Sequence, residues 1–320
     1  MVSGEAGSVD MTAAASTVPR NAPAKGIVYM LAASATLTIM DAAIKWLTAD
    51  YPVPQIGFMR YGVGIFVAAA MALRLGGIAT LRTRRLGGHA LRSLFNLVTM
   101  LTFYYALQAL PLTNSIAIGY AAPLFMTALS VPLLRERVGW RRWLAVVVGF
   151  LGVLIAAQPS AAGISAGALF ALAAALFYAL TLVTSRQLST TESSHTILFY
   201  YSLFVILALS VWMPWVWVTP HWKDLWLILF AGVAGSFGQF FLNQAMRYGE
   251  VSLLAPLDYS GLVWAGLLGF IVWGDVPTPV VLAGSAIIVS AGIYIVRREA
   301  ILRRQGARAA ATAPGSPQDS

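Results

Sequence analysis

Residues 106–136 read ALQALPLTNSIAIGYAAPLFMTALSVPLLRE, and residues 245–275 read AMRYGEVSLLAPLDYSGLVWAGLLGFIVWGD. The two stretches correspond at a displacement of 139 residues (259 − 120), which aligns Tyr120 with Tyr259 and the acidic Glu136 with Asp275. Earlier parts of the chain correspond at a displacement of 141, as Lys45 does with Arg186 (186 − 45). This pattern indicates two copies of one ancestral half.

Around these stretches the chain is that of a membrane protein, because 59% of its 320 residues are hydrophobic and 10% are charged. A helix needs about 20 apolar residues to cross the hydrocarbon core, and unbroken runs of that length are typical of helices and not of barrel strands. Ten such windows are found, over 26–47, 53–73, 93–110, 112–134, 140–157, 164–185, 196–217, 225–246, 251–273 and 277–296.

We therefore predict an all-α integral membrane protein with ten transmembrane helices in two five-helix repeats. Because five is odd, the second repeat enters the membrane inverted, which is an architecture of secondary transporters. The first repeat is expected over 25–157 and the second over 158–298. Residues 1–24 are small and polar, and residues 299–320 are basic and then rich in Ala, Pro and Ser, so both are expected to be disordered tails.

The positive charge follows the topology. Of the 21 Lys and Arg residues, Lys223 falls in an outer connection and Lys45 and Arg60 fall within spans, which leaves 21 − 3 = 18 on the other side. This bias predicts that both termini are cytoplasmic. The abundance of Arg and Ala is typical of a GC-rich bacterial genome, so the predicted location is the bacterial inner membrane. The net charge of +9 is then a topology signal, and we expect the lipid bilayer and no nucleic acid as a partner.

The sequence offers little for enzyme chemistry. It contains no cysteine, which excludes disulfides, thiolate metal sites and thiol catalysis. Residues 163–167 fit the G-x-S-x-G pattern around Ser165, but no strand precedes them and His89, His195 and His221 are scattered over connections. We expect no enzyme activity, catalytic residue, cofactor or metal. A membrane-embedded enzyme, a lipid-handling protein and a non-transporting sensor are the alternatives.

Four charged residues lie inside the expected spans: Asp41, Lys45, Arg60 and Asp258. A charge at a helix centre costs on the order of 3 kcal/mol on insertion, so such residues are the first candidates for function. Asp41 and Lys45 are four residues apart on one helical face, and Arg60 lies at a similar depth in the second span. Asp41 therefore either forms an internal ion pair with Lys45 or Arg60 that locks two helices, or forms with Arg60 an outer gate or orienting pair.

Asp258 differs because no basic residue lies near it in its own half of the sequence. It must face a cavity, find a partner across the bundle or be protonated. We expect it to bind a substrate cation or a coupling proton, and a satisfied interhelical bond is the alternative.

Proline indicates the same place. Pro123 in the fourth span and Pro256 in the ninth each remove one helical hydrogen bond, and these spans are repeat partners. Interrupted helices at corresponding positions of two halves are a clue to a transporter binding site. Tyr120 and Tyr259 occupy matching positions beside these expected kinks.

Further polar and aromatic residues could complete a pocket, although packing or an interhelical bond is at least as good an interpretation for each. Gln239 and Asn243 are four residues apart and share a helical face. As a set, aromatic faces and carboxylates favour a solute with a ring or a cationic group. The candidates are Asn96, Tyr104, Tyr105, Tyr178, Gln239, Asn243 and Gln244.

Residues 91–155 and 255–277 resemble the EamA branch of the drug/metabolite transporter superfamily in their Ala-Leu, Pro, acidic and Gly-Phe-Leu-Gly landmarks. Asp275 stands where that family usually has Glu. The stretches MDAAIKWL at 40–47 and FMRYGVGIF at 58–66 look most like bacterial S-adenosylmethionine and riboflavin carriers. The resemblance implies ten helices, movement of small organic solutes without ATP, and a central pocket lined by the first, third, fourth, sixth, eighth and ninth spans.

Together these features predict a secondary transporter that moves a cationic, zwitterionic or ring-bearing metabolite by alternating access. Proton coupling and assembly as a homodimer are left open by the sequence.

Overall fold

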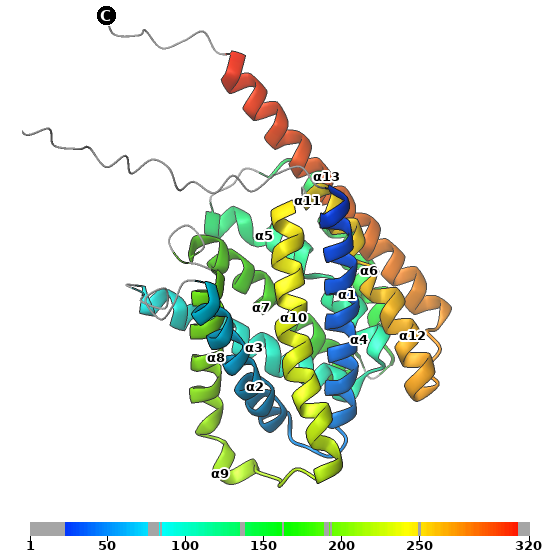
Figure 1. Ribbon diagram of the computed structural model, residues 1–320. Coiled ribbons are helices and arrows are strands. Elements are labelled where there is room, and N and C mark those ends of the chain that lie inside the picture. Colours follow the sequence, from blue (N-terminus) through cyan, green and yellow to red (C-terminus); the bar gives the residue numbers. More distant parts are fainter. Residues whose placement is uncertain are drawn as a thin grey trace, which may run out of the picture.

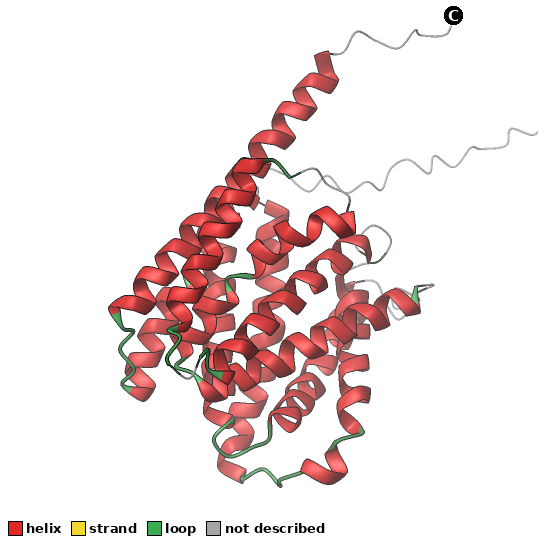
Figure 2. Cartoon of the chain, turned by 180° about the vertical axis from the view of Figure 1, so that it is seen from behind, coloured by secondary structure: helices red, strands yellow, loops and turns green. Residues whose placement is uncertain are grey.

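The computed structural model describes residues 23–75, 83, 85–134, 138–161, 163–188, 192, 194–248 and 251–312. Within these ranges the chain is helical apart from short connections and one isolated bridge between Ser160 and Gly163 (Figures 1 and 2). The elements are α1 (Pro23–Leu47), α2 (Val53–Leu75), α3 (Leu86–Ala109), α4 (Leu112–Gly119), α5 (Ala122–Leu134), α6 (Trp140–Ala157), α7 (Ala166–Leu188), α8 (Ser194–Ser210), α9 (Met213–Val216), η2 (Trp222–Asp224), α10 (Leu225–Tyr248), α11 (Val251–Asp258), α12 (Gly261–Trp273) and α13 (Pro279–Thr312).

Eight segments of the described chain are long and apolar enough to cross a membrane, so the protein is a multi-pass membrane protein. The other two expected spans fall on α3 and α8. α3 has 24 residues but is more polar, with Arg92 and Gln108 in it. α8 has 17 residues and ends at Ser210, because a turn at Val211–Trp212 and Pro214 begin a separate short helix. Ten spans therefore stay a prediction.

The helix bounds repeat along the chain. Shifting α3 (86–109) by 139 residues gives 225–248, which is α10. The same shift turns α4 (112–119) into 251–258, which is α11, and α5 (122–134) into 261–273, which is α12. Local sequence thus ends these helices at equivalent positions in both parts of the chain.

Packing follows the same correspondence. α1 packs along α10, and α7 packs along α3, so that the first helix after each expected repeat start lies against the third helix of the other (Figure 1). α2 packs against α8, and α6 packs against α13. The start of α1 and the C-terminal part of α13 lie at the same end of the bundle (Figure 1).

The main core lies where α1, α2, α3, α8 and α10 meet. Ile44 and Leu47 of α1, Ile56 of α2 and Leu107 of α3 are at most 2% exposed. These residues seal one end of the bundle with aliphatic side chains, so the polar side chains described below are held between rigid elements.

Two glycines let α6 and α13 approach closely. A Cβ on Gly284 would lie 2.6 Å from the backbone nitrogen of Ala156 and 2.7 Å from the carbonyl oxygen of Gly152. No side chain can be placed at that distance from a backbone without moving a helix, so this crossing depends on glycine.

The expected tails need one correction. α13 continues to Thr312, so the prediction that residues 299–320 are disordered is wrong for 299–312, where Ala, Leu, Arg and Gln favour a helix. Residues 313–320 lie outside the described chain. At the other end α1 begins at Pro23, a residue type suited to the first helical position, and the rest of the expected tail, 1–22, is outside the described residues.

We expect the substitution Gly284→Ala to lower the thermal stability of the detergent-solubilised protein, with a loss of about 1–3 kcal/mol typical of overpacking. Gly266→Ala in α12 is the matched control, because a Cβ there meets nothing within 4 Å. That change should be neutral or stabilising, since alanine favours a helix over glycine. Equal melting temperatures for the two variants would show that the α6–α13 crossing tolerates a wider separation.

Candidate functional site

Two helices of the described bundle are interrupted at equivalent residues. Tyr120 and Ala121 form a turn between α4 and α5, and Tyr259 and Ser260 form a turn between α11 and α12. The N–H of Tyr120 still donates to the carbonyl of Ile116 at 3.1 Å, so the first interruption is a local change of helix path and not a loop.

The prolines lie close to both turns. Pro123 is the second residue of α5, and Pro256 lies inside α11, two residues before Asp258. Because proline has no N–H, neither can donate to the carbonyl four residues earlier, which belongs to Gly119 in one case and Ser252 in the other.

The two interruptions are joined by hydrogen bonds. The hydroxyl of Tyr120 donates to the backbone carbonyl of Asp258 at 2.6 Å, and the hydroxyl of Ser34 on α1 donates to the same oxygen at 3.3 Å. Ser260 in turn donates to the Ser34 hydroxyl at 3.0 Å, and the rings of Tyr120 and Tyr259 lie 4.7 Å apart between centroids. One freed carbonyl therefore connects α1 to both interrupted helices.

Glycines make room for the two tyrosines. A Cβ on Gly261 would overlap the hydroxyl of Tyr120, and a Cβ on Gly292 would overlap the hydroxyl of Tyr259. Both rings are thus confined against a helix backbone, and neither can shift without moving α12 or α13.

The carboxylate of Asp258 has no cation beside it. It forms no ion pair within the described chain, and the groups that act on it electrostatically are the hydroxyls of Tyr120, Tyr178 and Tyr259. Its side chain is half-buried at the C-terminal end of α11, where the helix dipole is unfavourable for a negative charge. A bound cation or a proton would relieve both costs.

Arg60 is held by aromatic residues. Its Nη1 donates to the hydroxyl of Tyr104 at 2.9 Å, and its guanidinium lies 4.6 Å from the centroid of Tyr61. Gly235 on α10 leaves space for it, because a Cβ there would lie 2.6 Å from Nη2. Asp41 acts on Arg60 electrostatically, but no oxygen of Asp41 comes within 4.0 Å of its nitrogens.

Lys45 corrects one expectation. The ion pair that the four-residue spacing allowed between Asp41 and Lys45 is not formed. Instead Nζ of Lys45 donates to the carbonyls of Leu107 at 2.8 Å and Leu110 at 2.6 Å, and lies 5.5 Å from the ring of Trp273. The reason is that the last carbonyls of α3 have no helical donors and carry the negative end of the dipole, so they attract an ammonium group.

A second guanidinium lies on the far side of a tyrosine pair. The hydroxyls of Tyr61 and Tyr201 are hydrogen-bonded to one another, and the guanidinium of Arg92 lies 5.3 Å from the Tyr201 ring. Nε of Arg92 donates to Ser185 at 2.6 Å, whereas its Nη1 is buried without a hydrogen-bond partner. Tyr178 interacts electrostatically with Arg92 and with Asp258 and so lies between the two charges.

With this geometry established, known proteins identify the family. The model of the EamA-like transporter family matches residues 24–158 and matches again over residues 165–298. The chain belongs to the EamA-like transporter family.

Among the relatives of this EamA-family chain, an S-adenosylmethionine uptake transporter of Rickettsia prowazekii is 29% identical over 275 residues, covering 86% of this chain and 93% of the relative. A riboflavin transporter of Vibrio cholerae is 29% identical over 286 residues, covering 87% and 94%. A pseudopaline exporter, CntI, of Pseudomonas aeruginosa is 29% identical over 277 residues, covering 85% and 96%. The family and these names indicate a transporter of a small molecule and not an enzyme.

A solved structure, described as a crystal structure of protein, matches with a TM-score of 0.62 at 18% identity and covers 88% of this chain and 99% of that one. At this identity the match shows a shared fold.

Two groups of the EamA-family site were missed from sequence. Arg92 had been assigned to an inner connection because the third span was expected to begin at residue 93, whereas α3 begins at Leu86. Tyr61 and Tyr201 were not singled out, although they are 140 residues apart, a displacement between those already found in the repeat. The repeat itself was the signal that could have found them.

The other candidates lie as follows. Tyr104 binds Arg60, and Tyr178 lies near Asp258. Tyr105 stacks instead on Phe170 of α7, with centroids 5.4 Å apart. On α10, Gln239 is half-buried and Asn243 is exposed.

A separate polar cluster lies at the N-terminal end of α3, before the expected third span. His89 is buried against Tyr200, and its Nε2 lies 3.8 Å from Oε2 of Glu192, which also accepts from Thr83 at 2.7 Å. Burial lowers the pKa of His89, and the Glu192 carboxylate partly opposes that shift. In the described part of the chain, no three His, Asp or Glu residues are placed to hold a metal ion.

Proposed function

We propose that this EamA-family chain is a secondary transporter of the bacterial inner membrane, with ten spans and both termini cytoplasmic, that works by alternating access. The architecture rests on two inverted five-helix halves. Supporting observations are the helix bounds that recur after 139 residues, the packing pairs that map onto one another, and the family model that matches twice. Halves related in this way give two conformations of similar energy, open to opposite sides.

The observation that carries the substrate proposal is a pair of opposite charges without ionic partners. Asp258 has no cation beside it, and Arg92 has a buried Nη1 without an acceptor. Tyr178 interacts with both, so the two charges are near enough to be bridged through one solute. A buried charge is costly without compensation, so binding of a complementary solute stabilises both groups.

A solute with a cationic group for Asp258 and an acceptor for Arg92 fits this arrangement, and a ring would pack on the tyrosines at the helix turns. S-adenosylmethionine, the substrate in the names of several relatives, has a sulfonium, an ammonium, a carboxylate and a purine ring. Riboflavin, named for another relative, has a ring but neither charge. The uncompensated charges therefore favour a zwitterionic or cationic ring-bearing metabolite.

Asp41 and Arg60 are proposed as an orienting pair or gate. Arg60 is fixed by Tyr104 and Tyr61, and Asp41 acts on it without a direct ion pair, so the distance between them is free to change during the cycle. The interrupted α4–α5 and α11–α12 segments are the places where the helices can flex. Asp258 has a second role open to it, because the same carboxylate can carry a coupling proton when no solute is bound.

We expect Asp258→Asn to abolish uptake of labelled S-adenosylmethionine into proteoliposomes while the melting temperature stays near that of the parent. The amide keeps the shape of the side chain but removes the charge that the cation needs. Asp50→Asn, at an exposed position after α1, is the matched control and should transport normally. Near-normal uptake by the Asp258 variant would remove the carboxylate from the mechanism.

We expect Arg92→Gln to discriminate between solutes. Loss of a charge-assisted hydrogen bond should weaken half-saturation for S-adenosylmethionine by about tenfold or more, and leave decarboxylated S-adenosylmethionine unaffected. Arg74→Gln, at the exposed end of α2, is the matched control. The same loss for both solutes would mean that Arg92 stabilises the bundle and does not contact the carboxylate.

A further inference from the structure

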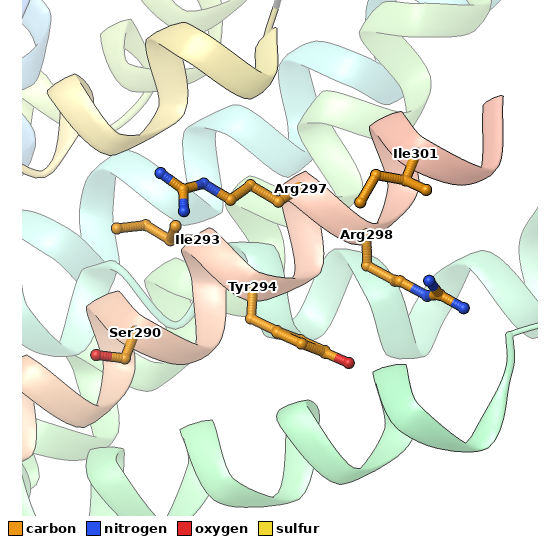
Figure 3. A pocket seen from close by; sticks show the side chains of 6 residues that line it. All are labelled: Ser290, Ile293, Tyr294, Arg297, Arg298 and Ile301. Atoms are coloured by element: carbon orange, nitrogen blue, oxygen red, sulfur yellow. The ribbon is translucent and has the colours of Figure 1, made fainter. Parts of the chain in front are cut away.

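A groove of about 500 Å³ follows one face of α13. Figure 3 shows that its side chains come from successive turns of this helix, with Tyr294 and Arg298 directed to the same side. Its residues recur at the three- and four-residue spacing of a single helical face. They are Ser290, Ile293, Tyr294, Arg297, Arg298 and Ile301.

The groove lies at the depth of lipid headgroups. The apolar part of α13 begins at Pro279, and Arg297 is 297 − 279 = 18 residues further on. At about 1.5 Å per residue this is roughly 27 Å, close to the ~30 Å thickness of a hydrocarbon core. The guanidiniums are therefore at the membrane surface, and Ser290 and Ile293 lie below them among the acyl chains.

The positive charge of the groove is not neutralised by the protein. Neither Arg297 nor Arg298 forms an ion pair within the described residues. The nearest acidic residue along the helix, Glu299, pairs instead with Arg142 of α6 at 3.7 Å. Tyr294 is 44% exposed, so its hydroxyl is accessible beside the two guanidiniums.

We propose that this groove binds an anionic phospholipid, with the phosphate held by Arg297 and Arg298. Guanidinium groups suit phosphate oxygens because each can donate two parallel hydrogen bonds. Tyr294 supplies a further donor at headgroup depth, and Ile293 supplies apolar surface for the start of an acyl chain. A volume of about 500 Å³ is within the roughly 300–1,000 Å³ of small-molecule sites.

The occupant is a membrane lipid and not the transported solute. The groove lies on α13 and α13 packs on α6 and α11, whereas the unpaired Arg92 and the tyrosines Tyr61 and Tyr201 belong to α3, α2 and α8. Lipid binding at this face would hold the end of α13 against the bundle at the level where it leaves the membrane. The inference is independent of the proposed substrate.

The test is the melting temperature of the purified full chain in neutral detergent, titrated with phosphatidylglycerol, phosphatidylcholine or inorganic phosphate. A ligand that binds only the folded state raises the melting temperature. We expect phosphatidylglycerol to stabilise the parent more than phosphatidylcholine does. In R297Q/R298Q the apparent affinity for phosphatidylglycerol should fall by about tenfold or more, because two charge-assisted contacts are lost.

The double variant R74Q/R141Q removes the same charge from other exposed positions and should keep the response. An equal loss in both double variants would overturn the proposal, since any basic surface would then suffice. Equal stabilisation by phosphatidylcholine would also overturn it, and protection by inorganic phosphate alone would show a free-anion site in place of a lipid site. If R297Q/R298Q does not purify as a folded protein, the single variants R297Q and R298Q give the same comparison.

Discussion

A polar backbone group freed inside a membrane must find its partner within the protein, because the hydrocarbon offers none. Here that constraint is met by the hydrogen bond from Tyr120 to the carbonyl of Asp258, which joins the two interrupted helices. Ser34 adds a second donor from α1. The interruption of α11 is therefore stabilised by the interruption of α4–α5, and a change in one must be accommodated by the other. The Asp258 carboxylate is positioned by this contact and left without a cation.

The same constraint explains how the remaining charges are arranged. Lys45 satisfies terminal carbonyls of α3, and Arg60 is enclosed by tyrosines and by the open backbone at Gly235. Both are thus compensated by the protein itself. Asp258 and Arg92 are the exceptions, and a family of small-molecule transporters is where such exceptions are expected, because a carrier must hold groups that only its solute completes. The groove on α13 applies similar chemistry at the membrane surface, where the lipid is the partner.

Much of this arrangement is legible in the sequence because helix formation in a membrane is a local property. Apolar length and the 139-residue displacement located α4, α5, α11 and α12, and Asp258 was recognised as a charge without a nearby partner. Side-chain partners were less predictable, because they depend on which helices touch. Lys45 bonds with α3 and not with Asp41 on its own helix, and Arg92 lies inside the bundle because α3 begins a full turn before its apolar run. Helical propensity alone would have extended α13 past residue 299, where composition suggested a tail.

The central claim is that the turn beside Asp258 is reached from both sides of the membrane in alternation. The chain has no cysteine, so Ser260→Cys, a conservative change at that turn, introduces a single thiol. Its reaction with a membrane-impermeant thiol reagent can be timed in proteoliposomes with the reagent outside only, and again with it enclosed inside only. The account predicts labelling from each side, slowed in both cases by a transported solute. Labelling from one side alone, unchanged by any solute, would contradict alternating access at this site.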